Sequence, residues 1–251
     1  MSVLHSFDLL GGGPIPYDDL CTLRPPTLDD IRRIGYDRYL QYLQLFTLER
    51  EPLWEALGIR EQLDSLPAAE QDHFSPFVLL TLQPVLRDLL REALSFFLCE
   101  TVVFDEPLGS YLLFRPEEDT PRRLVNARNF ESVRSGIRQL NCLSNQGAAK
   151  KRFRNRKARE IYEKIQRSRQ APKKPFADDS LSLPNLIAAV CVYHPSYNLL
   201  NIWPLTVYQL YDQFWRLHLK FQLDITGTRW AAWGTEPFEF SLWFKDMPLH
   251  S

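Results

Sequence analysis

The residues with the most evident chemistry are the lysines and arginines of the stretch KKRFRNRKAR at 150–159. Cationic side chains on one face can bind phosphates, and each contact releases counterions, so such binding is steeply sensitive to salt. The candidates for anion or nucleic-acid contact are Arg152, Arg154, Arg156, Lys157 and Arg159. One function that they indicate is a nucleic-acid-binding accessory protein that uses a basic helix over 150–169.

The same stretch also has the pattern of an ordinary amphipathic helix. Ala158, Ile161, Tyr162 and Ile165, with Phe153 ahead of them, recur mainly at three- and four-residue spacings. Such a stripe could pack against the rest of the chain and leave the charges as a solvated face.

Charge is distributed unevenly along a chain whose formal net charge is only −1. The chain has 30 basic and 31 acidic residues, and the segment 150–174 holds 12 of the basic ones and two of the acidic ones. The rest of the chain therefore has 18 basic and 29 acidic residues, a net charge of −11. The acidic remainder could neutralise the basic segment within the chain or across subunits. We favour a docked helix over protein–protein electrostatics, and both over nucleic acid.

The chain lacks the sequence patterns of common catalytic and metal sites. Gly11-Gly12-Gly13 is not followed by Gly-Lys-Ser/Thr, no two of the five histidines are four residues apart, and no G-x-S-x-G motif occurs. The four cysteines form no C-x-x-C pair. We therefore expect no enzyme, no metal and no cofactor.

Aromatic residues near the C-terminal end suggest a different kind of site. Trp230, Trp233, Trp243 and Phe244 follow a long apolar helix, predicted over 203–224, in a segment with weak helical periodicity. Aromatic side chains offer a large contact area at a low entropic cost, so these four are the candidates for partner binding.

The pattern of apolar residues and helix caps predicts a mainly α-helical protein. Thr27 caps a helix that continues to residue 50, Ser75-Pro76 begins another that continues to residue 98, and further helices are expected in 126–141, 182–195 and 203–224. β-Branched and aromatic residues flank Asp105–Ser110, which is typical of a hairpin. The expected fold is a helical bundle with one projecting β-hairpin at about 97–115, behind an irregular or edge-strand arm of about 26 residues.

Three regions are expected, which could together make one domain. They are an N-terminal helical region with the hairpin (1–145), a basic helix with a Pro-rich connector (146–175), and a C-terminal aromatic helical region (176–251). The longest apolar runs fall short of the roughly 20 residues of a membrane helix, and the first residues do not form a secretory signal. We expect a soluble intracellular protein with no membrane partner.

Four segments carry a resemblance to a known group of proteins. They are LRPPTLDDIRRIGYDRYLQYLQL at 23–45, NARNFESVRSGIRQLNCL at 126–143, YNLLNIWPLTVYQLYDQFWRLHLKFQLDI at 197–225 and SLWFKDM at 241–247. In this order they resemble small tail-module proteins, tail assembly chaperone-like or tail-associated, of tailed phages and prophages of Gram-positive bacteria.

The resemblance implies a function that rests on protein–protein contact. Other phage tail proteins, the tape-measure protein among them, would be the partners, and a homo-oligomer is a further option. The expected location is the cytoplasm of the bacterial host or the virion. A virion subunit of the portal, neck or baseplate is an alternative, which detection of the chain in purified virions would favour.

Overall fold

The computed structural model describes residues 3–50, 53–54, 58–59, 67, 74–115, 118, 120–143, 182–234 and 240–244. The chain divides into two compact units: residues 1–144 with 203–209 and 249–251, and residues 145–202 with 210–248. Both predicted region boundaries, at 145/146 and 175/176, lie outside the described residues and stay predictions.

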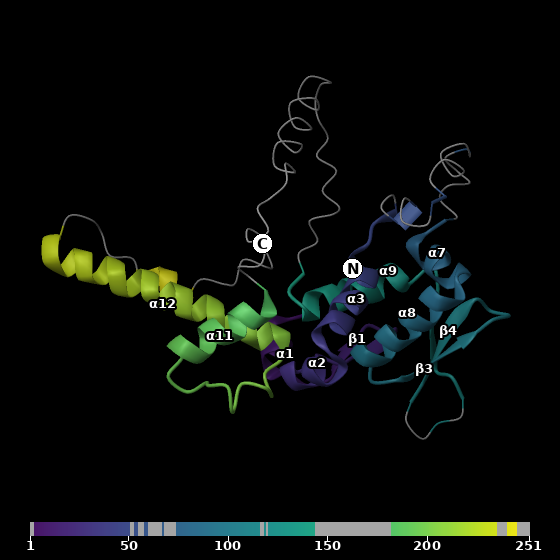
Figure 1. Ribbon diagram of the computed structural model, residues 1–251, viewed down its shortest axis with the longest axis horizontal. Coiled ribbons are helices and arrows are strands. Elements are labelled where there is room, and N and C mark those ends of the chain that lie inside the picture. The colour runs from purple at the N-terminus through teal and green to yellow at the C-terminus, as the bar shows by residue number, and fades with distance from the viewer. Residues whose placement is uncertain are drawn as a thin grey trace. The chain divides into compact units, whose positions relative to one another are not determined.

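The first unit contains most of the described helices (Figure 1). They are α1 (Ser6–Gly11), α2 (Leu28–Ile34), α3 (Tyr36–Thr47), α7 (Pro76–Leu82), α8 (Pro84–Phe97) and α9 (Phe130–Leu140). The predicted cap at Thr27 is confirmed, because its Oγ1 accepts a hydrogen bond from the Asp30 amide and the Asp30 carboxylate accepts one from the Thr27 amide. Ser75 caps α7 with Pro76 in the first turn, also as predicted, but the one helix expected from there to residue 98 is divided into α7 and α8 at Gln83-Pro84.

The single helix predicted from Thr27 to residue 50 is wrong. It is divided into α2 and α3 at Gly35, whose φ of +88° lies outside the helical region. Glycine adopts such a φ at little cost, so the chain can turn there between two helices.

Five short strands form two antiparallel sheets in the first unit. The first sheet pairs β1 (Ile15–Tyr17) with β2 (Cys21–Leu23). The second has the order β3-β4-β5, with β3 at Thr101–Asp105, β4 at Ser110–Phe114 and β5 at Arg123–Val125. Figure 1 shows α8 beside β3 and β4, and the Tyr111 hydroxyl of β4 donates to the Arg87 carbonyl of α8 at 2.8 Å.

These sheets correct the predicted fold class. The hairpin expected at about 97–115 is present as β3 and β4, but the described residues have eight α-helices and five strands, which make a mixed α and β protein rather than a helical bundle with one hairpin. β1, β2 and β5 are only three residues long. Strands this short are determined by pairing with a neighbour more than by local propensity, so the sequence pattern indicates at most that β1 and β2 lie in the expected irregular or edge-strand arm.

The core of the first unit is a cluster of aromatic rings. Phe46 contacts Phe97 edge-on at 5.7 Å and Phe130 at 6.3 Å, and Phe77 contacts Phe130 at 5.2 Å and Tyr111 at 6.0 Å. The rings come from α3, α7, α8, α9 and β4, so one cluster joins five elements of the unit.

The second unit contributes α11 (Leu183–Tyr193), most of α12 (Val207–Trp233) and the 3-10 helix η2 (Phe240–Phe244). Its Pro184 lies in the first turn of α11, where a missing amide hydrogen costs little. Among the described helices, none combines the length and hydropathy that crossing a membrane requires.

Candidate protein-binding site on α11 and α12

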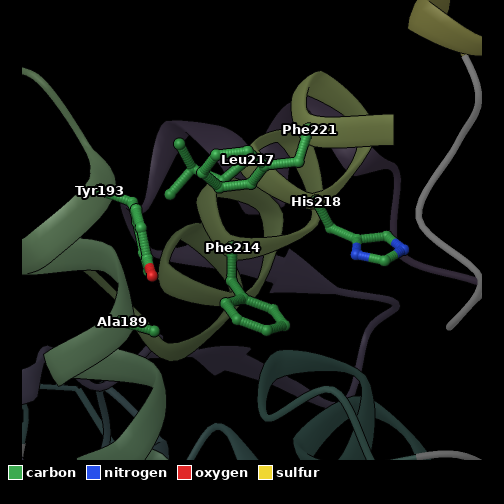
Figure 2. Close-up of a pocket in the computed structure, with 6 residues that line it drawn as sticks. All are labelled: Ala189, Tyr193, Phe214, Leu217, His218 and Phe221. Atoms are coloured by element: carbon green, nitrogen blue, oxygen red, sulfur yellow. The ribbon is translucent and has the colours of Figure 1, made fainter. Parts of the chain in front are cut away.

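A hollow in the second unit lies between α11 and α12. Its volume is about 340 Å³, and its lining is mostly apolar: Ala189, Tyr193, Phe214, Leu217, His218 and Phe221. Figure 2 shows Ala189 and Tyr193 on α11 facing Phe214 and Leu217 on α12, with the His218 ring directed away from Tyr193. The rings of Tyr193 and Phe221 meet edge-on at 5.2 Å.

α11 covers only part of α12. It lies beside the first turns of the long helix, whose last turns extend beyond it (Figure 1). On α12, Leu219 and Leu223 are buried, whereas Phe221 and Ile225 are exposed. Since four residues advance a helix slightly more than one turn, Leu219 and Leu223 share one face and Phe221 and Ile225 share another.

The four aromatic residues predicted to bind a partner are all exposed. Trp230 and Trp233 end α12 with 51% and 70% of their surface exposed, and Trp243 and Phe244 in η2 have 50% and 80% exposed. Large aromatic residues exposed in such number are typical of a binding surface rather than of a solvated helix end.

The polar side chains of α12 are held by neighbours one turn away. Lys220 Nζ donates to Asp224 Oδ2 at 2.7 Å, and the Gln222 amide and His218 Nε2 are 3.0 Å apart. The Trp215 and His218 rings stack with centroids 5.6 Å apart. Of these contacts, only the Lys220–Asp224 pair joins opposite charges, and it neutralises the two charged side chains beside Phe221.

Asp212 is the buried carboxylate of this helix. Desolvation raises its pKa, and Arg216, whose Nε lies 3.4 Å from Asp212 Oδ1, acts in the opposite direction. An acid held by an arginine one turn away is a common structural pair. Within the described ranges, no group of three or more His, Cys, Asp or Glu side chains could hold a metal ion.

The five basic candidates fall in the part of the chain that the structure does not describe. Arg152, Arg154, Arg156, Lys157 and Arg159 all lie within 144–181. Their assignment to anion or nucleic-acid contact, and the preferred interpretation as a docked helix, both stay predictions.

The hollow itself was missed by sequence reasoning. Phe214, Leu217, His218 and Phe221 have the spacing of one helix face, which was visible in the sequence. Apolar residues occur on nearly every side of α12, so the pattern could not show which face stays uncovered. The position of α11 decides that question.

Comparison with known proteins gives one result, and it falls on this region. Residues 171–248 match the family model of the YomV second domain, which is a phage- or prophage-type family. The match includes α11, α12 and η2 and about a third of the chain. No curated protein and no solved structure matches. The similarity supports a phage protein in general terms, and its description names no tail function.

Proposed function

We propose that this chain is a phage tail assembly chaperone or tail-associated structural protein that acts by protein–protein contact. The observation that carries the proposal is the exposure of Trp230, Trp233, Trp243 and Phe244 within the segment similar to a phage domain. The resemblance of four segments to tail-module proteins supports the same conclusion.

The surface suits a client whose contact residues are apolar. Indole and phenyl side chains can enter the grooves of a helical client, and the residues that lose most water contribute most of the binding energy. A tail chaperone would cover apolar surface on a client such as the tape-measure protein until the tube assembles around it. A structural protein would keep the same contact in the particle.

The test is co-purification with tail proteins encoded beside its gene. We expect the unmodified chain to retain one of them, and the double variant Trp230→Ala/Trp233→Ala to weaken that complex about 30-fold or more, as hot-spot residues do. Phe7→Ala is the control, because Phe7 is also an exposed aromatic residue but lies in the other unit. Circular dichroism would verify that each variant is folded.

Three results would contradict the proposal. They are retention of no tail protein, equal binding by the double variant, or a complex that dissociates between low and moderate salt as phosphate contacts do. Detecting the chain in purified virions would identify a structural component, and its absence from virions would identify a transient chaperone.

A further inference from the structure

The hollow on α12 has the composition of a site for one inserted side chain. Its four α12 residues, Phe214, Leu217, His218 and Phe221, occupy positions i, i+3, i+4 and i+7. In paired helices, four residues with this spacing form the hole that receives one side chain of the facing helix. In this chain, α11 adds Ala189 and Tyr193 to one side of the hole, and its centre is unfilled.

The residues on this face are arranged symmetrically about Phe221. Leu217 and Ile225 lie four residues to either side of it, and Phe214 and Thr228 lie seven residues to either side. Thr228 donates its hydroxyl to the Asp224 carbonyl at 2.7 Å, which leaves its methyl group for packing. These five residues are called the Phe221 stripe below. In an antiparallel pair of identical helices centred on Phe221, Leu217 would lie opposite Ile225 and Phe214 opposite Thr228.

The polar residues beside the stripe are also self-complementary. Lys220 precedes Phe221 by one residue and Asp224 follows it by three, on one flank. In an antiparallel pair centred on Phe221, each Lys220 would lie about 3 Å along the axis from Asp224 of the partner subunit. On the other flank, His218 would face Gln222 of the partner subunit in the same way. The Lys220–Asp224 ion pair and the His218–Gln222 contact could then form between the two copies instead of within each helix.

We propose that a second copy of this chain binds antiparallel along α12, with Phe221 at the two-fold axis. Ile225, which is 62% exposed, lies opposite Leu217 in this register, so it enters the hole of the other copy. The interface is isologous, so it contains two equivalent holes, one from each copy. It uses a face of α12 other than the one that contains Trp230, so it goes beyond the proposed function and does not depend on it.

Cysteine cross-linking tests the register. Phe221→Cys would place two thiols opposite each other at the axis, whereas in Ile225→Cys the two thiols would lie eight residues, about 12 Å, apart. A disulfide needs Cα atoms within about 7 Å, so we expect at least about tenfold more covalent dimer from Phe221→Cys than from Ile225→Cys under mild oxidation. The unmodified chain, with its four free cysteines, sets the background. Equal cross-linking of both variants, or none, would overturn the proposal.

Light scattering over a concentration series tests the dimer itself. The monomer mass is 29.5 kDa, and the proposal predicts a species of about twice that mass. Ile225→Asp should raise the dimer dissociation constant about 30-fold or more, because it would bury a charge in the apolar hole. Val85→Asp, an exposed apolar site in the other unit, should leave it unchanged. A monomer at every concentration, or a dimer insensitive to Ile225→Asp, would refute this interface.

Exchanging the charges of Lys220 and Asp224 tests the contacts on their flank and leaves the Phe221 stripe unchanged. Asp224→Lys alone would place lysines together across the interface and should weaken the dimer. Lys220→Asp/Asp224→Lys restores opposite charges in the same geometry and should recover most of the affinity. Failure of the double variant to recover would exclude the antiparallel register centred on Phe221. Recovery that disappears at high salt would support it, because exposed ion pairs are screened.

Discussion

At the scale of the residue, the most consequential side chain of the first unit is Arg134. It is almost completely buried, yet its guanidinium donates to the Phe46 carbonyl at 3.1 Å and the Leu48 carbonyl at 2.9 Å, and pairs with Glu131 at 2.8 Å. Burial lowers the pKa of Arg134 and Glu131 acts in the opposite direction. Arginine nevertheless stays charged at neutral pH, so this cation neutralises the carbonyl end of α3.

Arg134→Met should therefore cost about 2 kcal/mol of unfolding free energy, because the Leu48 carbonyl loses its arginine donor and the Phe46 carbonyl keeps only Arg138 Nε, at 2.6 Å. Urea denaturation measures the loss. Arg122→Met is the control, since Arg122 pairs with Glu118 at the surface and should change stability by less than about 1 kcal/mol. An Arg134→Met protein as stable as the parent would show that the hydrogen bonds of Arg134 contribute little to folding.

At the scale of the element, α9 packs against the β1–β2 sheet through a glycine. A Cβ atom at Gly136 would lie 2.9 Å from Leu23 Cδ1 and 3.2 Å from the Tyr17 ring. Tyr17 and Leu23 are both buried, so neither can move into open space. The absence of a side chain at Gly136 is what lets the helix approach the sheet this closely.

Gly136→Ala should lower the unfolding free energy by about 1–2 kcal/mol. The steric cost of overpacking, about 1–3 kcal/mol, outweighs the gain of up to about 1 kcal/mol that alanine brings to a helix. Gly11→Ala is a matched control, because Gly11 ends α1 and a Cβ atom there would contact nothing within 4 Å. Thermal denaturation of both variants measures the change in stability. A Gly136→Ala protein more stable than the parent would refute the close packing.

At the scale of the whole molecule, the first unit is built from distant parts of the sequence. The amide of Leu28 donates to the Leu205 carbonyl at 2.9 Å, and that of Asp29 to the Trp203 carbonyl at 3.0 Å. These contacts close the first unit by joining residues 203–209 to the N-terminal part of the chain. Gln209 adds to them, because its side chain donates to the Leu10 carbonyl at 2.7 Å and accepts from the Thr206 amide at 2.8 Å. The chain thus returns to its first residues before α12 continues.

Gln209→Ala should destabilise this closure by about 1–2 kcal/mol, since it removes a helix cap and a long-range hydrogen bond together. Hydrogen exchange should show faster exchange at the amides of Leu28 and Asp29, with little change at Leu98, whose amide is bonded within the α8 end. Gln41→Ala, on the exposed side of α3, serves as the control. Unchanged exchange at Leu28 would contradict a closing role for Gln209.

Local features of the fold could be predicted from the sequence because they depend on neighbouring residues. The capping box of Thr27 and Asp30, the start of α7 at Ser75-Pro76 and the turn between β3 and β4 each lie within a few residues of chain. Trp230 and Trp233 were recognisable as candidates because they lie beyond the helix predicted over 203–224, although α12 begins at Val207 and continues to Trp233.

Other features depend on partners far along the chain. The three-residue β5 exists because β4 offers it a pairing edge, and Gly136 is required because β1 and β2 lie against it. Similarly, the sequence by itself determined that α12 would be long and apolar on most sides, which predicts burial, yet much of its second half is exposed. Only the tertiary structure decided where α11 covers it and where the Phe221 stripe stays open, because burial of a given face depends on which other element packs there.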